Sequence, residues 1–154
     1  MSAGVFADSS ALVKLYADEQ DADGVRTLSP LLVSQLARVE VPAALWRKHR
    51  ADEIAASHVA ILVAEFEADY FGDIGTPPRF SVIAVTAGLI DAAAHLVGVH
   101  GLRAFDAVQL ASALAVADAV PDGVQFLAFD RALNTAAAAE GLTAPQIPPP
   151  QPLP

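Results

Sequence analysis

Four acidic residues lie in stretches of the sequence that are otherwise apolar. They are Asp8, after VFA; Glu40, in QLARVEVPAAL; Asp106, in LRAFDAVQLASAL; and Asp130, after FLAF. Carboxylates are seldom buried without a partner, because moving a charge out of water is costly. Carboxylates that meet repel one another unless protons or a cation intervene. If these four converge in the fold, a divalent cation such as Mg²⁺ or Mn²⁺, which takes oxygen ligands, would neutralise them.

Each of these acids also has a simpler interpretation when it is considered alone. Asp8 and Asp130 can cap the helices that follow them. Asp106 is expected in the first turn of a helix, where the helix dipole stabilises a negative charge. Glu40 can be an ordinary solvated helix residue. Only the four together favour a common site over four separate roles.

Short apolar segments alternate with helical patterns along the chain. The expected strands are 5–7, 31–34, 80–85 and 126–129, and the longer helices are expected at 35–49, 51–70, 86–96, 104–120 and 130–140. Strands without outward polar residues are typical of a parallel sheet that helices cover on both faces. We therefore predict an α/β fold, a single three-layer α/β/α sandwich with a short central parallel sheet. Sites in such folds form beyond the carboxyl ends of the strands, where Asp8 and Asp130 stand.

The composition fits one compact domain. The 154 residues are 54% hydrophobic and 18% charged, which is typical of a chain that buries a core. The absence of cysteine excludes disulfides, zinc–thiolate sites and a cysteine nucleophile. We find no signal-peptide pattern and no apolar run of about 20 residues, and so expect a cytoplasmic protein without a membrane contact. We place the domain at 1–144 and a proline-rich tail, expected to be extended and poorly packed, at 145–154.

The net charge of −9 gives no overall basic surface for nucleic acid. A nucleic-acid substrate would need bridging cations or local basic groups, and Arg103 is the better candidate because it precedes Asp106 closely. The basic residues of WRKHR, 46–50, more simply complement the C-terminus of a helix. The sequence has no glycine-rich phosphate loop and no HExxH motif, and its histidines are scattered.

Four phrases in the order FADSSALVKLY, ARVEVPAAL, LRAFDAVQLASAL and FLAFDRALNTAA resemble the PIN-domain family, and in particular the VapC-type ribonuclease toxins of bacterial toxin–antitoxin pairs. The resemblance runs from Val5 to about Leu142. It implies a Mg²⁺- or Mn²⁺-dependent endoribonuclease that hydrolyses RNA phosphodiester bonds. It also implies a homodimer, and inhibition by a small VapB-like antitoxin that lies over the active site. The acids of the family match Asp8, Glu40, Asp106 and Asp130.

For this chemistry we expect Asp8 and Asp106 to bind the metal directly. We expect Glu40 and Asp130 to act through water or to hold a second ion. Hydrolysis by an activated water would leave 5′-phosphate and 3′-hydroxyl ends on the RNA.

Two further residues are predicted to contact the substrate. Arg103 would lie near the site, and Ser10 matches a hydroxyl position of the family close to the first acid. Ser10 would orient water or metal, or would simply cap the helix that follows it. The family often has a hydroxyl residue two places before its fourth acid, where this chain has Ala128.

Three other interpretations remain open. The protein can be a catalytically silent PIN-like binding module, a metal-dependent phosphohydrolase that acts on another nucleic acid, or a structural α/β protein whose acids are unrelated caps. The helices around 12–16 and 54–66 carry more apolar positions than one core face requires. These positions predict either a partner surface or ordinary core packing.

Overall fold

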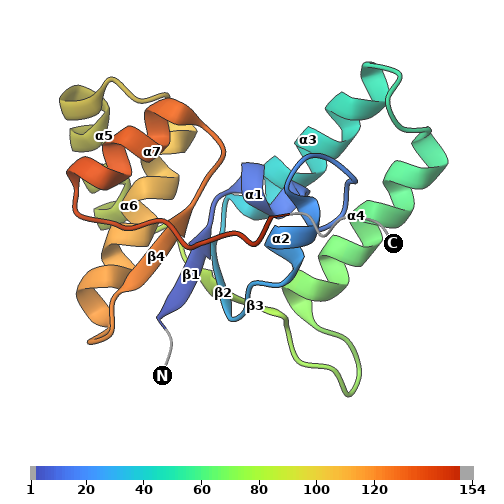
Figure 1. Ribbon diagram of the computed structural model, residues 1–154, viewed down its shortest axis with the longest axis horizontal. Coiled ribbons are helices and arrows are strands. Elements are labelled where there is room, and N and C mark those ends of the chain that lie inside the picture. Colours follow the sequence, from blue (N-terminus) through green and yellow to red (C-terminus); the bar gives the residue numbers. More distant parts are fainter. Residues whose placement is uncertain (1–2, 150–154) are drawn as a thin grey trace.

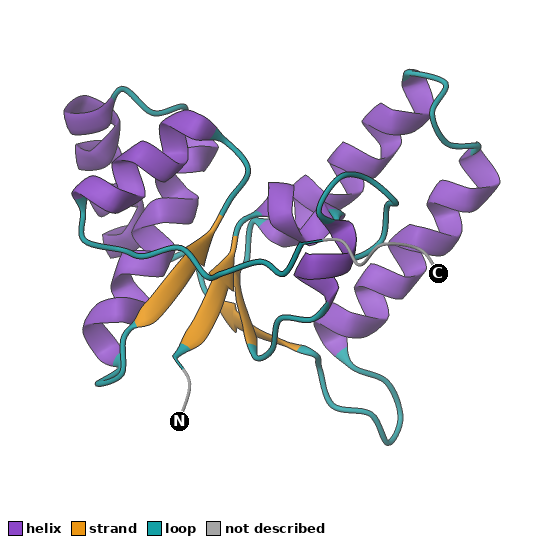
Figure 2. Ribbon diagram, in the orientation of Figure 1, coloured by secondary structure: helices purple, strands orange, loops and turns teal. Residues whose placement is uncertain are grey.

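In the computed structural model, which describes residues 3–149, a parallel four-stranded sheet lies between two groups of helices (Figure 1, Figure 2). The strands are ordered β3-β2-β1-β4. Along the chain the elements are β1 (Gly4–Ala7), α1 (Ser9–Val13), α2 (Ala22–Arg26), β2 (Leu31–Ser34), α3 (Ala37–Arg50), α4 (Ala56–Phe71), β3 (Phe80–Ile83), α5 (Ala87–His100), α6 (Ala104–Ala119), β4 (Val124–Leu127) and α7 (Arg131–Ala139). The predicted α/β fold with a short parallel sheet is confirmed.

The core is divided by the sheet into two layers. Successive side chains of a strand point to opposite faces, so Val5 and Ala7 of β1 pack with α1, α3 and α4, whereas Phe6 packs with α5, α6 and α7. On that second face Phe6 stacks against Phe126 of β4, with ring centroids 6.0 Å apart. Because helices cover both faces of the sheet, the strand sequences are mainly apolar, as expected for a parallel sheet; the polar exceptions are Ser34 in β2, Ser81 in β3 and Gln125 in β4.

The element boundaries differ from the expected ones at several places. Strand β4 begins at Val124 and ends at Leu127, two residues before the expected end, and a short loop then leads to Asp130, the N-cap of α7. Helix α5 continues through Gly98 to His100 and ends only where Gly101 adopts the left-handed conformation that suits glycine.

The segment that follows α7 packs along the molecule more closely than expected. The backbone N–H of Phe126 donates to the carbonyl of Thr143 at 2.8 Å, which extends the sheet beside β4. Ile147 packs against the core near α2, where a β-carbon at Gly24 would collide with it. The expectation of a poorly packed tail is therefore wrong for Ile147, and residues 150–154 of that expected tail lie outside the described residues.

The helix around 12–16 does not offer the partner surface that its apolar residues suggested. Leu12, Val13, Leu15 and Tyr16 are all buried in the core. In α4, by contrast, Ile61 remains 56% exposed. Within residues 3–149, no helix is both long and apolar enough to cross a membrane.

Candidate active site

Two neighbouring strands end together and bring two of the predicted acids to one edge of the sheet. Ala7, the last residue of β1, is paired with Leu127, the last residue of β4. The chain then continues into Asp8, whose N–H donates to the carbonyl of Leu127 at 3.0 Å. Ser10 ties the two strand ends together, because its hydroxyl donates to Asp8 Oδ1 at 2.6 Å and accepts from the N–H of Phe129 at 3.0 Å.

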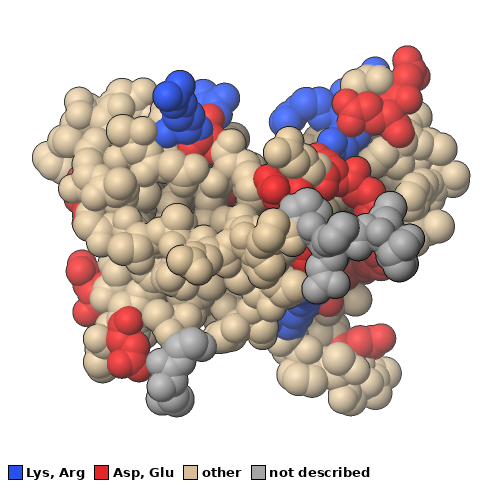
Figure 3. All heavy atoms as spheres, in the orientation of Figure 1, with Lys and Arg blue, Asp and Glu red and all other residues tan. Residues whose placement is uncertain are grey.

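All four predicted acids line one pocket of about 560 Å³ beyond these strand ends. Figure 3 shows the surface hollowed between the two groups of helices, with Lys and Arg atoms on both sides of the hollow. The residues that line the pocket are Asp8, Ser9, Ser10, Val39, Glu40, Ala43, Ala44, Arg47, Arg103, Ala104, Phe105, Asp106, Gln109, Phe129 and Asp130. Strand ends supply two acids, α3 supplies Glu40 and α6 supplies Asp106.

Asp8 is the most deeply buried of the four acids, with 4% of its surface exposed. Burial raises its pKa to about 7, although hydrogen bonds from Ser10 and from the N–H of Ala11 act in the opposite direction. The negative charges of Glu40 and Asp106 raise this pKa further. The bond from Ala11, 3.0 Å long, makes Asp8 the N-cap of α1. The interpretation as a cap is thus correct for Asp8, and it does not exclude a role in the pocket, because the same carboxylate lines it.

Glu40 is held by two residues that the sequence did not single out. Gln109 Nε2 donates to Glu40 Oε1 at 2.8 Å, and the hydroxyl of Ser9 donates to the same oxygen at 3.2 Å. Gln109 Nε2 also lies 3.0 Å from Ser9 Oγ. Burial raises the pKa of Glu40, the two hydrogen bonds lower it, and the charge of Asp106 raises it again.

Gln109 is buried, with 2% of its surface exposed, and its Oε1 has no hydrogen-bond partner in the described part of the chain. A buried amide with one unsatisfied atom is costly, and the hydrogen bond that its donor end makes to Glu40 offsets part of that cost. A signal for it did exist. Gln109 is the polar residue one helical turn after Asp106 in an otherwise apolar run.

The other two acids share one cation from the protein itself. Arg103 Nε lies 2.9 Å from Asp106 Oδ2, and Arg103 Nη2 lies 3.4 Å from Asp130 Oδ2. These contacts raise the pKa of the Arg103 guanidinium. Asp130 Oδ1 accepts a bond of 2.8 Å from the N–H of Leu133, so this acid also caps its helix, α7.

The donor atoms of the pocket suit a hard divalent cation. They are carboxylate and hydroxyl oxygens, and the charges of Glu40 and Asp106 add to the effect of burial in raising the pKa of Asp8. Across residues 3–149, no three Asp, Glu or His side chains are grouped so as to hold a metal ion as they stand. Mg²⁺ needs fewer, because it is commonly bound by one or two carboxylates with water and substrate phosphate completing its shell. The donor set therefore fits Mg²⁺ through one or two of these acids.

The basic residues of 46–50 divide between two roles. Arg47 lines the acidic pocket. Lys48 is instead engaged by acids, with its Nζ 2.9 Å from Glu19 Oε2 and 3.2 Å from Glu53 Oε2. Arg47 therefore joins Arg103 as a cation of the pocket, whereas Lys48 chiefly stabilises the packing of the 17–24 loop against α3.

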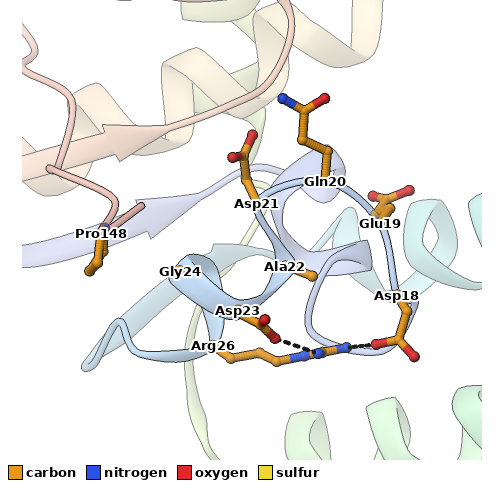
Figure 4. A pocket seen from close by; sticks show the side chains of 9 residues that line it. All are labelled: Asp18, Glu19, Gln20, Asp21, Ala22, Asp23, Gly24, Arg26 and Pro148. Atoms are coloured by element: carbon orange, nitrogen blue, oxygen red, sulfur yellow. Dashed lines mark hydrogen bonds and ion pairs between the residues drawn. The ribbon is translucent and has the colours of Figure 1, made fainter. Parts of the chain in front are cut away.

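A second pocket, of about 580 Å³, lies beside the acidic loop 18–23 and Pro148 (Figure 4). Among its carboxylates, Glu19 pairs with Lys14 and Lys48, whereas the side chains of Asp18 and Asp23 are 93% and 84% exposed. Arg26 pairs with both of them, at 2.8 Å and 3.3 Å. Solvation and this pairing account for these acids, so the pocket that holds Asp8 is the candidate active site.

The fold and this site together define a PIN-like domain, an α/β/α sandwich with an acidic pocket beyond the carboxyl ends of its parallel strands. Two solved structures share the fold: PAE2754 from Pyrobaculum aerophilum (TM-score 0.59, 20% identity, 92% of this chain and 83% of that one) and a toxin–antitoxin complex from Klebsiella pneumoniae (TM-score 0.53, 15% identity, 82% and 87%). A scan against models of protein families finds no match.

Curated relatives identify the family to which the chain belongs. It is 37% identical over 141 residues to Ribonuclease VapC45 and to Ribonuclease VapC49, from two strains of Mycobacterium tuberculosis, and the match covers 89% of this chain and 91% of each relative. The protein therefore belongs to the VapC ribonuclease family, as its sequence phrases predicted.

Proposed function

We propose that the protein is a divalent-metal-dependent endoribonuclease and the toxin of a toxin–antitoxin pair. The observation that carries this proposal is the meeting of four carboxylates in one open pocket, in a chain that shares 37% identity with two ribonucleases. Parallel pairing of β1 with β4 accounts for the meeting of Asp8 and Asp130, but it does not account for the two further acids that α3 and α6 bring to the same pocket. The protein would act on RNA in the cytoplasm.

Asp8 and Asp106 would hold Mg²⁺ or Mn²⁺, and Glu40 and Asp130 would act through water or hold a second ion. When bound, the metal lowers the pKa of a water molecule and neutralises phosphate charge. Asp8 is suited to this role because Ser10 and Ala11 fix its carboxylate at the pocket floor.

The remaining side chains position these groups. Gln109 and Ser9 hold Glu40 through one of its oxygens, which leaves Oε2 free of the protein hydrogen bonds that fix Oε1. Its raised pKa makes Glu40 a suitable acceptor for the proton of an attacking water. Arg103 is exposed at the pocket and pairs with Asp106 and Asp130. Once a metal ion neutralises the charge of these two acids, its guanidinium would contact a phosphate of the substrate.

A small antitoxin of the VapB kind is the proposed partner, lying over the pocket. The structural neighbour from Klebsiella pneumoniae is titled a toxin–antitoxin complex, which supports such a partner for a chain of this fold. We also propose a homodimer, as the family resemblance implies.

The proposal is tested by incubating the antitoxin-free protein with total RNA in Mn²⁺ and analysing the ends of the products. We expect 5′-phosphate and 3′-hydroxyl ends, and loss of cleavage for Asp106→Asn with the fold retained by circular dichroism. Ends with 2′,3′-cyclic phosphate would contradict the proposal, because they indicate attack by the hydroxyl of the RNA itself.

A second candidate is a metal-free binding module of the same fold. It is favoured by the position of Arg103, whose guanidinium already supplies a positive charge to Asp106 and Asp130. Such a module would bind RNA equally well in EDTA and would leave it uncut, so the same incubation, with and without Mn²⁺, separates the two candidates.

A further inference from the structure

Two aromatic side chains belong to the acidic pocket and have no role in the proposed hydrolysis. Phe105 directly precedes Asp106 in the first turn of α6, and Phe129 directly precedes Asp130 between β4 and α7. Both line the pocket together with the acids. Each ring is therefore attached to the chain next to a carboxylate of the proposed site.

These rings are exposed, in contrast to the aromatic residues of the core. Phe105 is 61% exposed and Phe129 is 36% exposed, whereas Phe6 and Phe66 are completely buried. Single exposed apolar side chains are common on protein surfaces, but a cluster of them rimmed by polar groups commonly marks a binding site, and these two rings lie in one pocket with four acids.

Contacts within the protein cover only part of the Phe129 side chain. The Nζ atom of Lys14 lies 4.3 Å from the centroid of its ring, a cation–π contact that occupies one side of it. The N–H of Phe129 donates to Ser10, so its backbone is fixed relative to Asp8. The ring is thus held in place at the pocket, with part of its surface still open to solvent.

Besides Glu40, helix α3 presents aliphatic side chains and a cation to the pocket. Val39, which is 68% exposed, and Ala43 and Ala44 line it, followed one turn later by Arg47. The pocket therefore combines four acids, two exposed rings, aliphatic side chains and the guanidinium groups of Arg47 and Arg103. A matching ligand has flat apolar groups that contact the rings and the aliphatic side chains, and an anionic group between them that contacts the guanidinium groups.

We propose that Phe105 and Phe129 are stacking positions for the bases of single-stranded RNA, on either side of the phosphate that faces the acids. The proposal rests on the proposed function and specifies its substrate class. Aromatic side chains bind unpaired bases by stacking, and this contact tolerates any base because each has a π-face. Bases inside a duplex are stacked on each other and paired, so the site is selective for single strands.

The direct test measures binding of a fluorescein-labelled short oligouridylate by anisotropy, in Ca²⁺ to limit cleavage. Phe105→Ala is expected to weaken binding by roughly fivefold or more, and Phe105→Trp to retain it. Phe71→Ala is the matched control, because Phe71 is 59% exposed and does not line the pocket. Circular dichroism melts of all variants check the fold.

A second probe isolates the bases from the charges. An oligomer of the same length with abasic riboses keeps the phosphates and loses every π-face. The parent protein should prefer oligouridylate to the abasic oligomer, and Phe105→Ala and Phe129→Leu should reduce that preference. A self-complementary RNA duplex should bind more weakly than the single strand.

The outcomes are distinct. If the parent cleaves RNA but Phe105→Ala binds oligouridylate as Phe71→Ala does, the stacking proposal is overturned and the proposed function stands. If the parent neither cleaves nor binds RNA, both proposals fail together. If Phe105→Ala leaves RNA binding intact and weakens only the binding of the antitoxin, the rings belong to the protein interface and the stacking proposal is wrong.

Discussion

The side-chain amide of Gln109 on α6 donates a hydrogen bond of 2.8 Å to Oε1 of Glu40 on α3, across the acidic pocket. Helices α3 and α6 lie in the two different layers of helices around the sheet. This bond therefore connects the layers at the proposed site. Together with the hydroxyl of Ser9, it fixes the orientation of the Glu40 carboxylate.

Gln109→Met tests whether this bond positions Glu40. Methionine has a similar volume and removes the unsatisfied Oε1 together with the donor, so the free energy of unfolding should change by no more than about 1 kcal/mol. Loss of the donor raises the pKa of Glu40 further, because the hydrogen bond from Gln109 lowers it.

If Glu40 acts as an unprotonated acceptor, kcat for RNA cleavage should fall about tenfold. The acid limb of the pH profile should move to higher pH, while KM changes little. Ser112→Ala, which alters a buried polar residue of the same helix that does not line the pocket, serves as the control. An unchanged pH profile with reduced kcat would indicate that Gln109 has a different role.

The metal-free protein should lose stability as the pH rises, because of Asp8. Burial raises the pKa of Asp8 to about 7 from its ordinary value of 3.8. Between these values the folded protein retains a proton that the unfolded chain has released, so this contribution to stability is fully present below about pH 4 and is lost as the pH rises through about 7.

In the Asp8→Asn variant the side chain is uncharged at every pH, so the variant should not show this loss of stability. In EDTA, its Tm relative to the parent should therefore be higher at about pH 8 than at about pH 5. Thermal melts followed by circular dichroism at both pH values give the comparison. A difference in Tm that is the same at both pH values would show that Asp8 is not protonated in the folded protein. Added Mn²⁺ should raise the Tm of the parent and leave that of Asp8→Asn unchanged.

Arg103→Gln should separate metal binding from substrate binding. The guanidinium lies 2.9 Å from Asp106 and 3.4 Å from Asp130, so it competes with a metal ion for these acids. Because the side chain is 79% exposed, its loss should change the Tm little. The variant should bind Mn²⁺ more tightly and cleave RNA with a higher KM. Arg131→Gln, an exposed cation on α7, should change neither value; weaker Mn²⁺ binding in Arg103→Gln would contradict the competition.

The contact between α2 and the C-terminal segment should appear as a coupled pair of substitutions. Gly24→Ala should destabilise the fold by about 1–3 kcal/mol, because its β-carbon meets Ile147 and approaches the carbonyl of Pro148. In the Ile147→Ala background the same change should be much milder, since alanine favours the helix over glycine. Urea titration of the four proteins gives the coupling energy; strictly additive effects would mean that the segment does not pack there in solution.

Much of the fold was predictable because apolar runs and caps are local signals. Asp8 and Asp130 were recognisable at strand ends, since each stands directly after an apolar run and before a helix. Their convergence follows from the parallel pairing of β1 with β4, which any sandwich of this kind provides. The strand expected at 126–129 lies two residues earlier, at Val124–Leu127. The prediction failed because apolar residues continue into the loop, where Phe129 is exposed at the pocket.

The contacts between side chains could not be predicted in the same way. The partners Gln109 and Glu40 lie 69 residues apart in sequence and meet only through the packing of two helices against one sheet. The contact of Arg103 with Asp106 is a local pair three residues apart, but its contact with Asp130, 27 residues further along the chain, depends on the packing of α7 beside α6. Such pairings depend on rotamers and distances that the pattern of the sequence does not encode.

The proposed metal site is tested most directly by the binding of Mn²⁺ to the antitoxin-free protein, measured by calorimetry at neutral pH. We expect saturable binding that Asp106→Asn abolishes and that Asp118→Asn, the same change at an exposed acid of the same helix outside the pocket, leaves intact. Absence of binding to the folded parent, or equal binding by Asp106→Asn, would contradict a metal site at these acids and favour the metal-free binding module.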